Sequence, residues 1–101
     1  MPDSFKPEED VAAASVQLVH AVGMHARPAV KLVKLAKRFR AEIAVRVAGG
    51  QWIDAKSVAK VIAMRAVRDS MLEFEARGAD AEAAVAALVA LVARDFIENG
   101  G

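Results

Sequence analysis

Cysteine is absent from this 101-residue chain, which excludes a disulfide framework and a thiolate metal site. Aromatic residues are scarce, with four phenylalanines, one tryptophan and no tyrosine, although 55% of the residues are hydrophobic. The core must therefore be built from Ala, Val, Leu and Ile. No apolar run is long enough to span a bilayer, and the acidic first residues lack the basic start and apolar block of a signal peptide. These absences predict a cytoplasmic protein without membrane insertion.

An excess of one charge is also lacking, because 14 basic residues oppose 13 acidic ones and the net charge is +1. Such a balance gives no strong attraction to nucleic acid or to a membrane surface. The distribution is uneven, since five Lys and Arg side chains crowd into residues 31–40 while residues 3–10 are acidic. We therefore expect no nucleic-acid partner, but a local basic surface.

The chain is long enough for one domain. Residues 1–12 contain two prolines and an acidic cluster without an apolar period, which predicts a flexible N-terminal extension followed by a folded domain over residues 13–101. Apolar periodicity predicts seven elements in that domain. Strands are expected over residues 15–22, 41–47, 51–54 and 71–77, and helices from just after His25, from the cap Ser57 to about Ala66, and from the cap Asp80 through Phe96.

The predicted order is strand, helix, strand, strand, helix, strand, helix. The turn Ala48-Gly49-Gly50 indicates a hairpin and hence antiparallel pairing. A four-stranded antiparallel sheet with three helices on one face is the simplest way to bury every apolar stripe. The expected fold class is therefore α+β.

The segment GMHARPA, residues 23–29, combines residue types that suit phosphate chemistry. A helix start presents free amide hydrogens and partial positive charge, which favour an anion, and Pro28 suits the first helical turn. Arg27 adds a guanidinium that matches phosphate oxygens. A neutral imidazole such as that of His25 is a nucleophile. Spacing alone leaves open the alternative that His25 is a capping or surface residue.

GMHARPA and the following VKLVKLAKRFRAEIAV resemble the active-site segment of the HPr family of phosphocarriers. The resemblance covers roughly residues 14–98, including AKSVAK at residues 55–60. It implies an HPr-like open-faced sandwich of four antiparallel strands and three helices. It also implies a carrier rather than an enzyme, with no cofactor of its own. It also implies that His25 accepts a phosphoryl group on Nδ1 from Enzyme I, in the phosphoenolpyruvate-dependent phosphotransferase system. His25 would then pass the group to an EIIA-type protein, and Arg27 would contact it.

Two positions depart from the family pattern. Val22 stands where members of the sugar-uptake branch often have an asparagine that orients the histidine, and Arg65 stands where a glycine is frequent. Together with Met24, Val22 is more similar to the nitrogen-related branch than to the sugar-uptake branch.

Ser57 has two compatible interpretations. Its hydroxyl can cap the second helix, a contribution of about 1 kcal/mol, and we favour that role. It also aligns with the serine that an HPr kinase/phosphorylase modifies in some members of the family. Phosphate at a helix start is electrostatically tolerated.

A docking surface is predicted around His25. Methionine suits surfaces that meet several partners, and a basic rim steers acidic ones. The side chains expected to form this surface are Met24, Val58 and Met64, with Lys34, Lys56 and Lys60 beside Arg27. Ile62 could join the apolar part, but we favour a core position for it. A carrier must also release its partners, so we expect a small, weak interface and a monomer.

Two other function classes fit parts of the pattern. The element order also occurs in ferredoxin-like binding modules, although the strands lack the exposed aromatics that stack bases. A regulatory homologue could instead use phosphorylation of His25 or Ser57 as a switch. His20 is interpreted as a strand histidine near the sheet surface, with no contact to His25 assumed. No spacing of His, Asp or Glu suggests a metal site.

Overall fold

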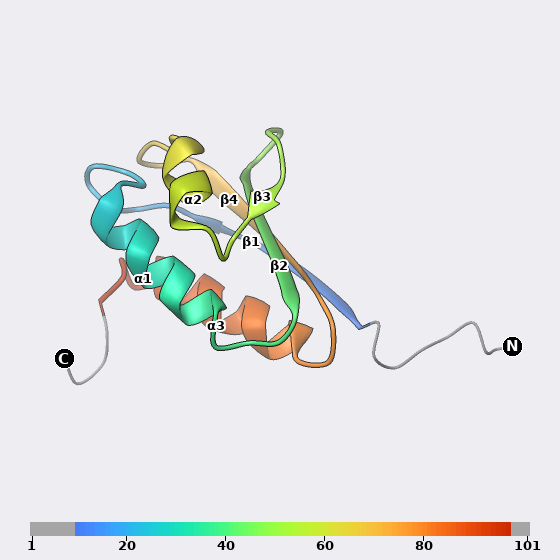
Figure 1. Cartoon of the computed structure of the whole chain (residues 1–101). Helices are drawn as coiled ribbons and strands as arrows, with labels where there is room; N and C mark the ends of the chain where they lie inside the picture. The colour runs from blue at the N-terminus through green and yellow to red at the C-terminus, as the bar shows by residue number, and fades with distance from the viewer. Residues whose placement is uncertain (1–9, 98–101) are drawn as a thin grey trace, which may run out of the picture.

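The computed structural model describes residues 10–97, which form one sheet and three helices (Figure 1). The seven elements follow the predicted order. They are β1 (Val11–Gln17), α1 (Ala26–Ala36), β2 (Glu42–Val47), β3 (Ile53–Asp54), α2 (Val58–Ala63), β4 (Met71–Arg77) and α3 (Ala81–Ala93). The expected α+β fold class is confirmed.

The sheet is antiparallel throughout, with the strand order β1-β4-β2-β3. Phe74 of β4 lies opposite Ala14 on one side and Val45 on the other. Figure 1 shows the three helices on one side of this sheet. Because side chains alternate along a strand, Leu72, Phe74 and Ala76 are buried under the helices, while the intervening glutamates are only half-buried on the opposite face.

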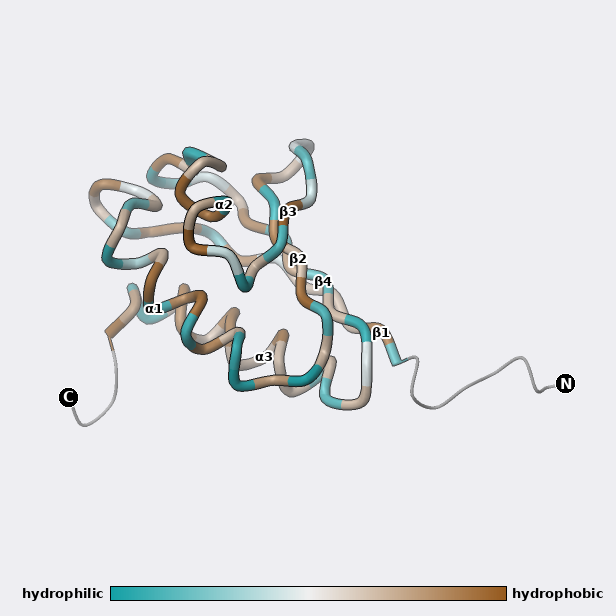
Figure 2. The backbone as a smooth tube through the Cα atoms, viewed as in Figure 1, coloured by the Kyte–Doolittle hydropathy of each residue, from teal (hydrophilic) through white to brown (hydrophobic). Residues whose placement is uncertain are grey.

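The helices bury their faces in two different ways (Figure 2). α1 alternates between hydrophilic and hydrophobic segments and buries one stripe that includes Leu32 and Val33. α3 contains alanines, valines and leucines almost throughout, and it packs against β1 and β4. The core is built mainly from aliphatic side chains around Phe74, as expected from the scarcity of aromatics.

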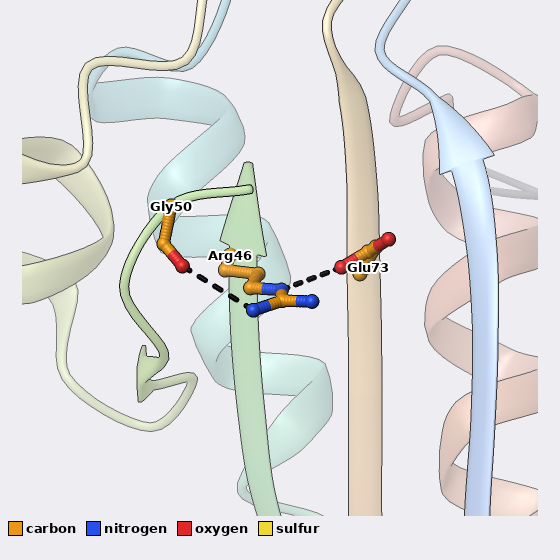
Figure 3. Close-up of polar contacts among 3 residues, drawn as sticks. All are labelled: Arg46, Gly50 and Glu73. Carbon is orange, nitrogen blue, oxygen red and sulfur yellow. Dashed lines mark hydrogen bonds and ion pairs between the residues drawn. The ribbon is translucent and has the colours of Figure 1, made fainter. Parts of the chain in front are cut away.

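On the face of the sheet away from the helices, Arg46 contacts both the neighbouring strand and the β2–β3 turn (Figure 3). Its guanidinium pairs with Glu73 on the neighbouring strand β4 and donates to the carbonyl oxygen of Gly50. The same group lies 4.4 Å from the centroid of the Trp52 ring. Arg46 therefore fixes the β2–β3 hairpin across the sheet, on the side opposite α1.

The first strand begins earlier than predicted. β1 covers Val11–Gln17 rather than residues 15–22, and its first two residues pair with Arg77 and Ala76 of β4. The boundary drawn after residue 12 for the extension is therefore wrong by two residues. Residues 1–9 of that predicted extension lie outside the described residues. The alanines of β1 give little apolar alternation, so its position depends on pairing with β4.

The ends of three other elements differ from the prediction. β3 has two residues rather than four, and α2 stops at Ala63. α3 ends at Ala93, and Asp95 and Phe96 then adopt left-handed backbone conformations with φ of 56° and 61°. Their amides donate to the carbonyl groups of Val92 and Leu91, which closes the helix end. This turn directs the Phe96 ring into the core, where 3% of the residue is exposed.

Asp80 occupies the N-cap position of α3, but its carboxylate does not cap that helix. Its two oxygens accept hydrogen bonds from the amides of Arg40 and Ala41, at 2.9 and 2.8 Å. The prediction of a capping side chain is therefore wrong. The carboxylate instead ties the start of α3 to the chain that leads into β2.

These bonds predict a dependence of stability on acid. The pKa of Asp80 is lowered below its ordinary value of 3.8, and the largest cause is the hydrogen bond from the Arg40 amide. Burial raises the pKa in opposition to this. The Ala41 amide and the charge of Lys56 lower it further. The folded-state pKa is thus below the unfolded one, so the stabilisation is complete above pH 3.8 and is lost as the pH falls through the folded-state pKa.

Asp80→Asn should therefore lower the urea midpoint at neutral pH and reduce the loss of stability in acid. Urea unfolding as a function of pH measures both effects. An acid limb of the same steepness in wild type and variant would contradict this role of Asp80.

Candidate functional site

His25 immediately precedes α1 and occupies its N-cap position, with φ of −133° and ψ of −165°. The ring makes no capping hydrogen bond, and the first turn contains no acidic residue. The first helical bond runs from the amide of Ala29 to the carbonyl oxygen of His25, at 2.9 Å. The amides of Ala26 and Arg27 precede that bond, so they are available to an anion beside the ring.

The His25 ring is half-buried, and its two nitrogens differ in environment. Nε2 is buried and has no hydrogen-bond partner within residues 10–97. The ring centroid lies 5.1 Å from that of His20, with 61° between the two planes. His20 follows β1 rather than lying in it, so its interpretation as a strand histidine is wrong. Its contact with His25 was not predicted from the sequence. With Nε2 turned inward, Nδ1 is the nitrogen left for chemistry at the surface.

Two loops hold the backbone that leads to His25. The residues after β1 form a turn in which the Gly23 amide donates to the His20 carbonyl oxygen at 2.9 Å. The Met24 amide then donates to the carbonyl oxygen of Ala66, at 2.8 Å. Gly23 has a φ of +75°, and a Cβ added there would lie 2.6 Å from the same Ala66 oxygen. The loop after α2 thus supports the start of α1 through a close backbone contact.

Arg27 lies in the first turn of α1, two residues after His25, and its side chain is exposed. Its guanidinium makes no hydrogen bond or ion pair with another residue in the described part of the chain. It is therefore free to turn toward an anion bound at the helix start.

Two of the predicted docking residues are not available for docking. Met24 is 5% exposed, because its backbone bond to Ala66 turns the side chain into the core. Lys56 donates from Nζ to the carbonyl oxygens of Phe39 and Ala41, both at 2.8 Å, just beyond the C-terminal end of α1. Met24 is therefore a core residue, and Lys56 fixes the segment that leads into β2.

The other predicted docking residues are more accessible. Lys34 and Lys60 are exposed, whereas Val58 and Met64 are partly buried against the core. Ile62, which was assigned to the core, is 37% exposed, so that interpretation is wrong.

Exposed apolar side chains that sequence reasoning missed lie on the two supporting loops. Val22 and Val67 are 69% and 66% exposed, and their loops touch where a Gly23 Cβ would lie 3.0 Å from the Val67 Cα atom. Val67 stands outside every predicted element, whereas Val22 ends the predicted strand over residues 15–22, which in the structure stops at Gln17.

Ser57 is the N-cap of α2, and its Oγ accepts a hydrogen bond from the Lys60 amide at 3.2 Å. The capping interpretation is confirmed. Arg65, where the family often has glycine, has a φ of 54°, the left-handed conformation that glycine adopts without strain. Arg65 thus adopts a backbone conformation that a glycine at this position would adopt without strain.

The basic stretch of residues 31–40 forms one wall of a groove between α1 and α3. The residues that line it are Lys31, Lys34, Leu35, Lys37, Arg38, Leu91 and Arg94. Lys31 closes one end, since its Nζ donates to the Phe96 carbonyl oxygen at 3.0 Å. The predicted local basic surface is thus present. Within residues 10–97, no helix is long and apolar enough to cross a membrane, and no three potential metal ligands cluster.

Comparison with known proteins points to one family. The family model described as "PTS HPr component phosphorylation site" matches residues 12–94. Phosphocarrier protein NPr of Escherichia coli is 36% identical over 85 residues, which are 84% of this chain and 94% of that protein. Phosphocarrier protein HPr of Haemophilus influenzae is 39% identical over 77 residues, which are 76% and 89% of the two chains.

A solved structure agrees with the sequence comparisons. The crystal structure of HPr from Bacillus anthracis matches with a TM-score of 0.76 and 34% identity, over 81% of this chain and 96% of that one. All three similarities extend over nearly the whole length of the compared proteins.

Proposed function

This chain belongs to the HPr family and is a phosphocarrier of the phosphotransferase system, and on this premise we propose that His25 is the residue that carries the phosphoryl group. In this proposal Nδ1 of His25 accepts the group from Enzyme I and passes it to an EIIA-type protein. The observation that supports it most strongly is the position of the ring, with Nε2 buried at the start of a helix whose first turn has no acidic residue.

The transfer step follows from that position. The Nδ1 lone pair attacks phosphorus, the new N–P bond forms, and the bond from phosphorus to the donor's nitrogen breaks. The dianionic oxygens then lie near the free amides of Ala26 and Arg27 and within reach of the Arg27 guanidinium. These groups stabilise the carried phosphoryl group. Transfer to the acceptor is the same step in reverse.

Partner binding is assigned to the surface around that ring. Val22, Ile62 and Val67 supply exposed apolar contacts, and the exposed Lys34 and Lys60 lie on the neighbouring helices. Val58 and Met64 contribute their accessible parts. Small apolar contacts with a basic rim suit acidic partners that bind briefly and leave. We place the protein in the cytoplasm as a monomer that shuttles between Enzyme I and its acceptor.

Two points stay predictions: that Ser57 is phosphorylated for regulation, and that the chain belongs to the nitrogen-related branch of the family. A kinase would have to release the Ser57 hydroxyl from its hydrogen bond with the Lys60 amide. A phosphate there would place nearly two negative charges beside the start of α2 and repel acidic partners.

Incubation of the protein with Enzyme I and isotopically labelled phosphoenolpyruvate tests the proposal. We expect a single phosphoryl group that is lost in acid and retained in alkali, as phosphohistidine is. Phosphoserine survives acid, so the same assay distinguishes His25 from Ser57. An acid-stable label, or no label under conditions that phosphorylate a known HPr protein, would contradict the proposal.

A further inference from the structure

His20 connects the ring of His25 to the end of α3. Its own ring packs edge-on against His25 at 5.1 Å and against Phe96 at 6.0 Å, with 61° and 71° between the planes. Phe96 is 3% exposed and is held by the left-handed turn after α3, while its carbonyl oxygen accepts from Lys31 of α1. These three rings, called the ring row below, extend from the core to the surface imidazole.

The ring row contains two unsatisfied nitrogens. Nδ1 of His20 and Nε2 of His25 are both buried and have no hydrogen-bond partner within residues 10–97. A buried polar nitrogen without a partner destabilises the folded state, so such atoms need an explanation. A neutral imidazole has one N–H donor and one acceptor nitrogen. One hydrogen bond between the two rings, reached by rotation about the side-chain bonds, would satisfy both atoms.

We propose that His20 is a positioning residue for phosphoryl transfer, in which its Nδ1 accepts a hydrogen bond from the Nε2–H group of His25. This inference rests on the proposed role of His25. A proton fixed on Nε2 leaves the Nδ1 lone pair of His25 free for attack on phosphorus. The proton of His20 then lies on its own Nε2. The function of His20 is thus to select the reactive tautomer of its neighbour.

The same hydrogen bond strengthens during the reaction. When Nδ1 forms its bond to phosphorus, the proton on Nε2 stays in place and the His25 ring gains positive charge. A hydrogen bond donated by a charged group is roughly twice as strong as a neutral one. His20 therefore stabilises the phosphorylated ring more than the free ring, and Phe96 supports His20 from the other side.

His20→Phe is the sharpest test, because phenylalanine keeps an aromatic ring between His25 and Phe96 but has no nitrogen. We expect phosphoryl transfer from Enzyme I to slow about tenfold, the lower end of the loss seen when the hydrogen-bond partner that orients a metal-bound histidine is removed. His20→Gln, whose side-chain oxygen can accept a hydrogen bond, should restore most of the rate. In ¹⁵N spectra of histidine-labelled protein in alkaline solution, wild-type His25 should carry its proton on Nε2, and in His20→Phe a larger fraction should carry it on Nδ1.

The outcomes separate this inference from the proposed function. If the wild-type protein takes up no label at His25, the proposed function fails. If His25 is labelled but its tautomer is unchanged in His20→Phe, the positioning role of His20 is overturned. This holds whether the variant keeps the wild-type transfer rate or loses it. A wild-type spectrum with the His25 proton on Nδ1 also overturns it, and that measurement does not depend on the folding of any variant.

Discussion

His25→Ala is expected to abolish phosphoryl uptake, with a loss of more than about a thousandfold in rate. The variant removes the nitrogen that forms the bond to phosphorus. The other histidine is not expected to replace it, because His20 lies in the loop after β1 and not at the start of α1, where the free amides are. Uptake is measured with Enzyme I and labelled phosphoenolpyruvate, by comparing initial rates and final yields.

Loss of uptake has to be separated from loss of folding. The ring of His25 is half-buried and makes no capping hydrogen bond, so its removal should leave the fold in place. Ser57→Ala is the matched control, since it removes a helix cap worth about 1 kcal/mol and leaves the proposed nucleophile intact. We expect Ser57→Ala to melt earlier and to take up label normally. Full labelling of His25→Ala would exclude His25 as the acceptor.

Gly23→Ala is expected to cost about 2–4 kcal/mol of folding free energy, an unusually large effect for one methyl group. Two causes add. The residue has a φ of +75°, a conformation that alanine adopts only with strain. The new Cβ would also lie 2.6 Å from the carbonyl oxygen of Ala66, which the Met24 amide needs as its hydrogen-bond acceptor. Relief of the clash must therefore move the backbone just before His25.

Gly49→Ala separates the two causes. Gly49 has a φ of +84° in the β2–β3 turn, but an added Cβ would meet nothing within 4 Å. This variant should lose only the conformational part, about 1–2 kcal/mol, and should take up phosphate at the wild-type rate. Urea unfolding gives the two free energies. Equal losses of folding free energy in the two variants would show that the contact with Ala66 is unimportant. A normal rate of phosphoryl uptake in Gly23→Ala would show that the His25 backbone had not moved.

The sequence predicts the order of the elements because strong apolar periods mark most of them. β4 has the predicted bounds, since its apolar and charged residues alternate without a break. β1 starts four residues earlier than expected, because Ala12 and Ala14 are too small to mark a strand face. The pairing with β4, which no local pattern contains, determines where that strand begins.

In the candidate site, too, the features set by local sequence were predicted and those set by tertiary contacts were not. The position of His25 before α1 and the cap at Ser57 follow from local patterns, and both are found. The burial of Met24 and the exposure of Ile62 were assigned the wrong way round. The bond between the Met24 amide and the Ala66 carbonyl is a tertiary contact that no local pattern contains. Ile62 lies on the short helix α2, which buries only Val61. The contact of His20 with His25 also depends on tertiary structure. It is formed where a turn after β1, the start of α1 and the end of α3 meet.

The identity of the atom that bears phosphorus tests the account most directly. In histidine-labelled wild-type protein phosphorylated by Enzyme I, ³¹P and ¹⁵N spectra should show phosphorus coupled to Nδ1 of His25, while Nε2 of that ring keeps its proton. Phosphorus coupled to Nε2, coupled to His20, or bound to an oxygen would contradict the account.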